Sequence, residues 1–116
     1  MLVPMMERHP RHFFLRGVVS RDTVRGGNFV RERRLDIFAT DLAPVLEDEA
    51  INLLVIATRH NEHAAQTLAG LQAGKHVFVE KPLAVHWEEL DQLVQAYRAL
   101  EAPPQLMVGF NRRFSP

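Results

Sequence analysis

The chain has 116 residues, of which 47% are hydrophobic and 24% charged, and its acidic and basic side chains cancel to a formal net charge of zero. This length suits one domain with a real core, and the neutral balance gives no reason to expect a nucleic acid or a membrane as partner. The sequence has no cysteine and no apolar run long enough to span a bilayer, so we expect a cytoplasmic protein without disulfides.

The first third of the chain predicts short strands separated by helices. In chain order we expect a short helix over residues 1–9, a strand over 13–20, a loop leading into a helix over 21–35, and a strand over 36–39. The pair Gly26-Gly27 indicates the loop. Thr40 or Asp41 can then cap a short helix, because their side-chain oxygens accept hydrogen bonds from first-turn amides.

The rest of the chain continues the alternation with longer elements. Residues 51–57 are apolar on both faces, as in a central parallel strand. A helix over 61–73 should stop at Gly74 and be followed by a strand over 76–79, an extended turn over 80–83, an amphipathic helix over 86–100 and a strand over 105–110. The apolar side of the helix over 86–100 comprises Trp87, Leu90, Leu93, Val94 and Tyr97. Strands that alternate with helices predict an α/β protein with a three-layer, Rossmann-like parallel sheet.

Polar residues follow the predicted strands where the chain leaves the sheet. They occur at Ser20-Arg21, from Thr58 to His63, from Glu80 to Pro82, and after Phe110. The loops that follow parallel strands meet at one edge of an open sheet, so these residues should converge there. Lys81-Pro82 is the most specific feature, because an extended proline step would direct the lysine into the crevice at that edge. The alternative is an ordinary polar turn.

Four segments together resemble one enzyme family. They are NLLVIAT over 52–58, the helix beginning at His63-Ala64, AGKHVFVEKPL over 73–83, and VGFNRRF over 108–114. In this order and spacing they resemble the Gfo/Idh/MocA oxidoreductases, NAD(P)-dependent dehydrogenases and reductases that act mostly on sugars and cyclitols. The sequence at Thr58-Arg59-His60 and over 111–116 is most similar to that of a subgroup fused behind a zinc-alcohol-dehydrogenase-like domain.

The resemblance implies roles for individual residues. Lys81 matches the family lysine beside the nicotinamide and the substrate hydroxyl, where a cation can orient the oxygen and stabilise developing negative charge. Thr58 matches a residue that lies along the ribose and nicotinamide, whereas Arg59-His60 replaces the family's usual Pro-Asn. The predicted catalytic residue is Lys81, and the predicted cofactor-binding residues are Ser20, Arg21, Ala57, Thr58, His60, His63, Glu80, Lys81, Pro82, Asn111 and Arg112.

The choice of cofactor should depend on the end of the strand over 13–20. Ser20-Arg21 stands where NAD-binding proteins carry an acidic residue, and Arg21 could accommodate the 2′-phosphate of NADP. This favours NADP over NAD, although the neighbouring Asp22 works against it and a surface arginine at a turn is the alternative. We expect no metal site, because His60 and His63 share a helix face without a third ligand.

The family's first strand and its Gly-x-Gly-x-x-Gly loop have no counterpart in the sequence, since Gly26-Gly27 has the wrong spacing and context. The loop's amides and the following helix N-terminus hold the pyrophosphate, so cofactor binding should be impaired. We expect a partial NAD(P)-binding domain over 1–116, with residues 111–116 starting toward an absent substrate domain. It would be an inactive fragment of a dehydrogenase. The alternative is a non-catalytic nucleotide-binding or oligomerising module; a homo-oligomer through open sheet edges is expected.

Overall fold

The computed structural model describes residues 2–109, and the chain divides into two compact units, Met1–Val45 and Leu46–Pro116. The predicted site residues Asn111 and Arg112, and the predicted exit over 111–116, lie outside the described residues. Among the residues that the structure does describe, no helix combines the length and the apolar character needed to cross a membrane. Each unit is an α/β arrangement with parallel strands, which confirms the predicted fold class.

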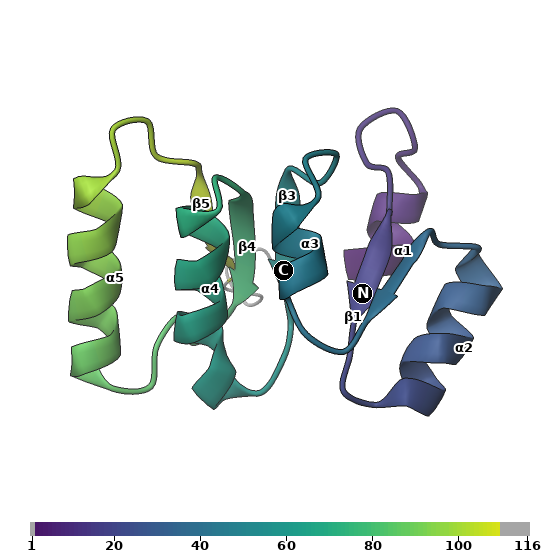
Figure 1. Cartoon of the computed structure of the whole chain (residues 1–116), viewed down its shortest axis with the longest axis horizontal. Coiled ribbons are helices and arrows are strands. Elements are labelled where there is room, and N and C mark those ends of the chain that lie inside the picture. Colours follow the sequence, from purple (N-terminus) through teal and green to yellow (C-terminus); the bar gives the residue numbers. More distant parts are fainter. Residues whose placement is uncertain (1, 110–116) are drawn as a thin grey trace, which may run out of the picture. The chain divides into compact units, whose positions relative to one another are not determined.

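The first unit contains a two-stranded parallel sheet (Figure 1). Residues Gly17, Val18 and Val19 pair with Ile37, Phe38 and Ala39. The elements are α1 (Leu2–Glu7), β1 (Gly17–Val19), α2 (Thr23–Arg33), β2 (Ile37–Ala39) and, at the boundary with the second unit, α3 (Ala43–Glu47). As predicted, Asp41 caps α3, since its Oδ1 accepts a hydrogen bond from the Ala43 amide at 2.9 Å.

The strand β1 is shorter than the predicted strand over 13–20. Its pairing is limited to three residues because β2 itself has only three. Phe13 and Phe14 precede the pairing and are exposed, so their β-forming side chains gave a misleading signal.

Helix α2 begins earlier than the sequence predicts. Asp22 caps it, and its Oδ1 accepts from the Arg25 amide at 3.0 Å. Gly26 and Gly27 therefore lie inside the helix, and the prediction that they form a loop is wrong. A Cβ atom on Gly26 would lie 2.2 Å from Phe38 Cε2, so the glycine lets the helix approach β2 closely.

The second unit contains a three-stranded parallel sheet in the order β3-β4-β5. Its elements are β3 (Leu53–Ile56), the 3-10 helix η1 (His60–Glu62), α4 (His63–Gln72), β4 (His76–Glu80), α5 (Trp87–Ala99) and β5 (Leu106–Gly109). The strands and the α-helices match the predicted elements, with shorter bounds except for β4, which continues through Glu80. Among the described residues the strands thus form two sheets, of two and three strands, where the sequence predicted one.

The core of the second unit lies between the sheet and α4. Val77 and Val79 of the central strand β4 are almost fully buried, as is Leu71 of α4. Figure 1 shows α4 and α5 side by side, and the two helices are in contact. Gly74 has a φ of 79° and follows α4, which confirms the predicted left-handed stop.

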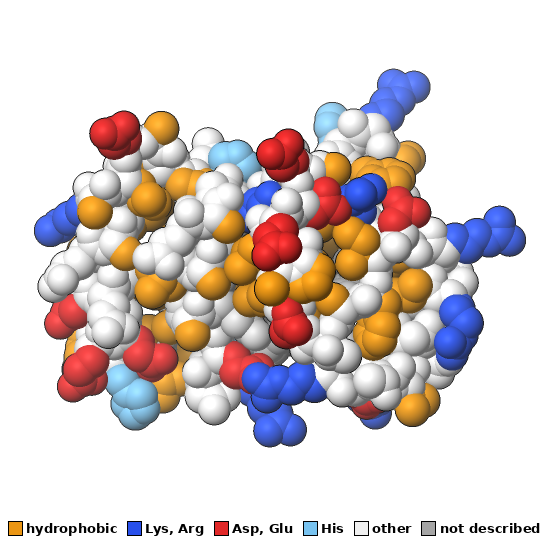
Figure 2. All heavy atoms as spheres, viewed as in Figure 1, with side chains coloured by type: hydrophobic (Ala, Val, Ile, Leu, Met, Phe, Trp, Pro, Cys, Tyr) orange, Lys and Arg blue, Asp and Glu red, His pale blue; other side chains and the backbone are white. Residues whose placement is uncertain are grey.

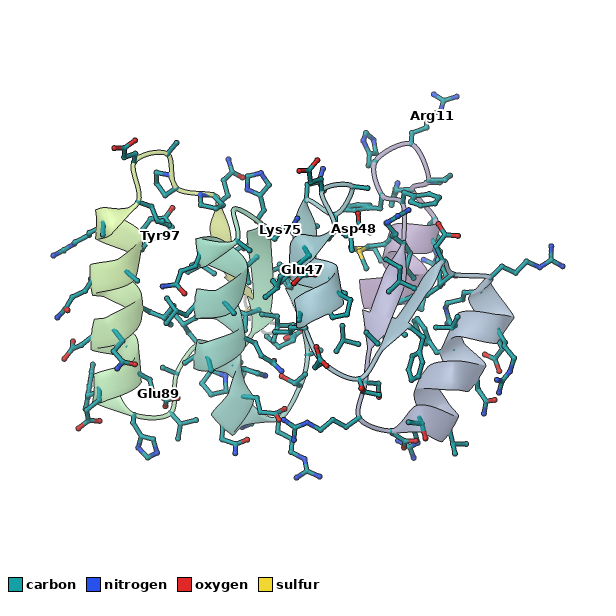
Figure 3. All side chains as sticks on the ribbon, in the orientation of Figure 1. Arg11, Glu47, Asp48, Lys75, Glu89 and Tyr97 are labelled. Carbon is teal, nitrogen blue, oxygen red and sulfur yellow. The ribbon has the colours of Figure 1, made fainter. Side chains whose placement is uncertain are left out.

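Two contacts fix the ends of these elements (Figure 3). The Nζ of buried Lys75 donates to the Asp48 carbonyl at 2.8 Å, and the Tyr97 hydroxyl donates to the Pro104 carbonyl at 2.9 Å. The predicted apolar side of α5 is buried only in part. Leu93 is buried, but Trp87 is 78% exposed at the start of the helix.

Candidate functional site

The candidate site lies at the carboxyl ends of β3 and β4. The two strands are parallel neighbours, and Ile56 at the end of β3 is paired with Val79. The segment beginning at Ala57 and the turn at Lys81-Pro82 therefore leave the sheet at the same edge. Because both segments follow buried strands, the sheet fixes where each of them starts.

Thr58 is tied to helix α4 by its side chain and by its backbone. Its hydroxyl Oγ1 donates to Gln66 Oε1, and its carbonyl oxygen lies 3.0 Å from His63 Nε2. Ala57, Thr58 and His60 are all exposed, so this segment faces solvent while His63 and Gln66 of α4 contact Thr58.

His63 joins that segment to the lysine turn. Its Nδ1 lies 2.8 Å from the Pro82 carbonyl oxygen, and the whole residue is only 1% exposed. The ring also stacks edge-on against His60, with 5.6 Å between ring centroids. Since both His63 nitrogens face backbone carbonyls, neither is available for a metal ion, and the described residues include no cluster of three or more metal-ligating side chains.

Lys81 is the charged residue at this edge. Its side chain is exposed and forms no ion pair with any residue in 2–109, while its backbone amide donates to the Gly109 carbonyl at 3.3 Å. The peptide bond between Lys81 and Pro82 is cis. An accessible ammonium on a fixed backbone can orient an oxygen atom of a bound substrate.

Glu80 and Gly109 adjoin the lysine. Glu80 is half-buried and pairs with Gly109 across β4 and β5. A Cβ on Gly109 would lie 2.8 Å from the Phe78 ring and 3.4 Å from Glu80 Oε2, so only glycine fits there without a shift. No role was predicted for Gly109, although it lies in the VGF segment directly before the predicted site residues.

The predicted residues Ser20 and Arg21 form a separate turn in the first unit, between β1 and α2. The Ser20 amide donates to the Ala39 carbonyl at 2.9 Å, and Ser20 Oγ accepts from the Asp22 amide at 3.2 Å. Arg21 is exposed. The carboxylate of Asp22 caps α2 and accepts from the Arg25 amide, so it already occupies one of the first-turn amides that could otherwise receive a phosphate.

Charge on the visible surface is mixed rather than of one sign. Figure 2 shows blue basic and red acidic side chains interspersed, with basic side chains over α2, which includes Arg25, Arg31 and Arg33. Some of these are neutralised locally: Arg33 Nε lies 2.8 Å from Glu7 Oε1. This distribution does not form the continuous basic stripe typical of nucleic-acid binding.

Comparisons with known proteins agree on one family. The family described as "Oxidoreductase family, NAD-binding Rossmann fold" (GFO_IDH_MocA) matches residues 1–110. The scyllo-inositol 2-dehydrogenase (NAD(+)) of Bacillus subtilis is 33% identical over 92 residues, which cover 79% of this chain and 26% of that protein. The scyllo-inositol 2-dehydrogenase (NADP(+)) IolW of the same organism is 39% identical over 74 residues, 64% of this chain and 20% of that protein.

The fold agrees as well. A crystal structure of a probable dehydrogenase from Thermotoga maritima superposes with a TM-score of 0.84 at 23% identity, covering 97% of this chain and 34% of that one. The chain thus spans no more than about a third of the length of these similar proteins.

Proposed function

Because the chain belongs to the Gfo/Idh/MocA oxidoreductase family, whose members have an NAD-binding Rossmann fold, we propose that it is the cofactor-binding part of an enzyme that transfers hydride between NAD(P) and a sugar, polyol or cyclitol. One observation carries this proposal: an exposed lysine, Lys81, lies at the sheet edge where the segment with Thr58 also leaves the sheet. Inositol dehydrogenases among the relatives support the substrate class.

In this proposal the bound nicotinamide supplies or accepts the hydride, and the protein's own residues position the substrate. Lys81 holds the reacting oxygen through its ammonium group and stabilises negative charge that develops on it. Glu80 and Pro82 support the lysine, while Ala57, Thr58 and His60 border the same edge. Asn111 and Arg112 remain proposed cofactor contacts on sequence grounds alone.

The preference for NADP also remains a proposal. Arg21 is exposed at the end of β1, which supports a role as partner of a 2′-phosphate. The nearby Asp22 carboxylate opposes a second anion, although its engagement with the Arg25 amide offsets part of this repulsion. The relatives include both an NAD-linked and an NADP-linked enzyme, so family membership by itself favours neither.

We further propose that these 116 residues bind the cofactor weakly and do not catalyse hydride transfer by themselves. They contain no Gly-x-Gly-x-x-Gly sequence, so the backbone amides that would hold a pyrophosphate are absent from them. We also propose a parent protein with a zinc-alcohol-dehydrogenase-like domain and a substrate domain. This proposal depends on the sequence of residues 58–60 and 111–116 alone.

A second candidate is a non-catalytic module that associates through its sheets. The described strands form two small sheets, and β3 is an edge strand of the larger one. An unpaired strand edge is a template for pairing with another chain, so a homo-oligomer is the expected state of this candidate. Sedimentation of the purified chain decides it: a monomer at all concentrations contradicts the module, and a concentration-dependent dimer supports it.

The proposed function is tested by titrating NADPH and NADH into the purified chain while following nicotinamide fluorescence. We expect a dissociation constant weaker than about 1 µM for both, because the pyrophosphate site is missing from these residues. Arg21→Ala should weaken the binding of NADPH and leave the binding of NADH unchanged. Lys81→Met should change the affinity for both cofactors. A dissociation constant of about 1 µM or tighter would overturn the proposed impairment, and binding that neither substitution changes would overturn the proposed site.

A further inference from the structure

The buried imidazole of His63 makes a contact pattern that its predicted role as a cofactor ligand does not explain. Both of its nitrogens lie within hydrogen-bond distance of backbone carbonyl oxygens, at 2.8 Å from Pro82 and 3.0 Å from Thr58. At 1% exposure the ring has no nitrogen left to offer a dinucleotide. These two carbonyls belong to the two segments that leave β3 and β4 at the candidate site.

We propose that His63 is a positioning residue that holds the Lys81-Pro82 turn against the end of β3 and so sets where the Lys81 ammonium is presented. This inference rests on the proposed function for its purpose, but its structural content does not. The Pro82 carbonyl directly follows Lys81 in the chain, so a hydrogen bond there restrains the lysine's backbone from its carboxyl side. The amino side is restrained by the bond from the Lys81 amide to Gly109.

The chemistry of imidazole suits this task. A carbonyl oxygen only accepts hydrogen bonds, and the two ring nitrogens of an imidazole are far enough apart to face acceptors on two sides of the ring. A neutral ring carries one N–H, so it donates to one of the two carbonyls at a time, and the other contact then lacks a proton. We call this arrangement the His63 brace: the ring is buried between the two segments, and in the tautomer protonated at Nδ1, the nitrogen with the shorter contact, it donates to the Pro82 carbonyl.

The neighbouring hydrogen bond at Thr58 strengthens this reading. Gln66 lies three residues after His63 on α4 and accepts from the Thr58 hydroxyl. One face of α4 thus holds the Thr58 segment by its side chain and its backbone, and holds the lysine turn by its backbone alone. His63 is the only residue among 2–109 for which a hydrogen bond to Pro82 is seen, so its loss should free that turn first.

The test compares His63→Phe, which keeps a buried ring and removes both nitrogens, with Thr67→Val as control. Thr67 is fully buried on the same helix, and its hydroxyl has no hydrogen-bond partner among the described residues, so its removal should disturb neither segment. Hydrogen exchange reports two amides of β4 and its end: Lys81, bonded to Gly109, and Val77, bonded to Gln105. In His63→Phe we expect Lys81 to exchange roughly tenfold faster and Val77 to change little, because the lost bonds act locally.

Binding gives a second readout that a general loss of stability would not produce. His63→Phe should weaken the binding of NADPH severalfold and leave the binding of adenosine 2′,5′-bisphosphate unchanged, because only NADPH has a nicotinamide that can lie beside Lys81. If the wild-type chain binds neither probe, the proposed function fails while the exchange data still decide the brace. Equal acceleration of Val77 and Lys81, or none of either, overturns the brace whatever the binding shows.

The wild-type chain supplies an independent check should His63→Phe fail to fold. A buried, hydrogen-bonded imidazole N–H exchanges slowly with water, so a His63 ring proton should be visible in nitrogen-15-edited proton spectra. Its persistence supports the brace. A ring that exchanges at the rate of an exposed imidazole contradicts it.

Discussion

The sheets of the two units differ in how far their strands are buried. In the second unit the central strand β4 buries Val77 and Val79, and α4 covers them with Leu71. In the first unit no residue of β1 or β2 is buried, and the sheet has three paired residues on each strand. Thr58 and Lys81 therefore follow strands of a packed sheet, whereas Ser20 and Arg21 follow a short, partly exposed sheet that α2 approaches closely at Gly26.

The largest expected effect comes from the core of the second unit. Leu71→Ala should lower the free energy of unfolding of that unit by about 2–5 kcal/mol, because Leu71 is 2% exposed and its loss leaves a cavity. Chemical denaturation with amide exchange of β4 as local probe measures it. Val24→Ala on α2, where Val24 is 70% exposed, is the control and should change stability by less than about 0.5 kcal/mol. Equal effects would remove the contrast between the units.

The adjacent glycines of α2 sharpen the comparison within the first unit. Gly26→Ala should destabilise by about 1–3 kcal/mol, because the new methyl would collide with the Phe38 ring. Gly27→Ala should instead stabilise by about 0.5–1 kcal/mol, since its Cβ would meet only Arg31 at 3.4 Å and alanine favours a helix. Thermal unfolding of both variants measures the difference. The same sign for both would show that α2 does not lie against β2 as described.

Asp22 tests how far a cap supports the first unit. Asp22→Ala should cost about 0.5–2 kcal/mol by removing the acceptor for the Arg25 amide. Asp22→Asn keeps a capping oxygen without the charge, so it should recover most of the stability. If the carboxylate also opposes a 2′-phosphate, Asp22→Asn should bind NADPH more tightly than the wild type. Unchanged stability in Asp22→Ala would contradict the importance given to this cap.

The smallest effect is expected at a surface ion pair. Arg16 Nη1 lies 3.3 Å from Asp36 Oδ2; the Asp36 side chain is exposed and that of Arg16 is partly exposed. Asp36→Asn should therefore change the free energy of unfolding by less than about 1 kcal/mol, and less still at high salt. Urea denaturation at low and high salt checks this. A loss above about 2 kcal/mol would mean that the first unit depends on charge more than on capping.

The sequence predicted the second unit better than the first, for physical reasons. The apolar run 51–57 marks a strand and Gly74 marks a helix stop, because burial and backbone conformation leave direct traces in residue type. The prediction that this strand is central and buried on both faces is wrong for the described sheet, since β3 is at its edge and Val55 is exposed while Leu54 and Ile56 are buried. Gly26-Gly27 misled because glycine serves both turns and close helix contacts, and only the position of Phe38 in space distinguishes the two.

The candidate site was predictable in its location but not in its internal contacts. The spacing of Thr58 and Lys81 after two strands was enough to place both at one sheet edge. That His63 would be buried between the Thr58 and Pro82 carbonyls depends on how α4 is set against the sheet, which periodicity does not specify. The roles of the site residues themselves remain predictions.

The central claim is that the ends of β3 and β4 form the nicotinamide side of a cofactor site. The most direct test is to add NADPH to the nitrogen-15-labelled chain and follow amide chemical shifts, which report weak binding as well as strong. We expect NADPH to cause saturable shifts at Thr58, His63 and Lys81, and also at Ser20 and Arg21, whereas adenosine 2′,5′-bisphosphate should leave Thr58, His63 and Lys81 unchanged. Shifts confined to other surfaces, or none at millimolar NADPH, would contradict it.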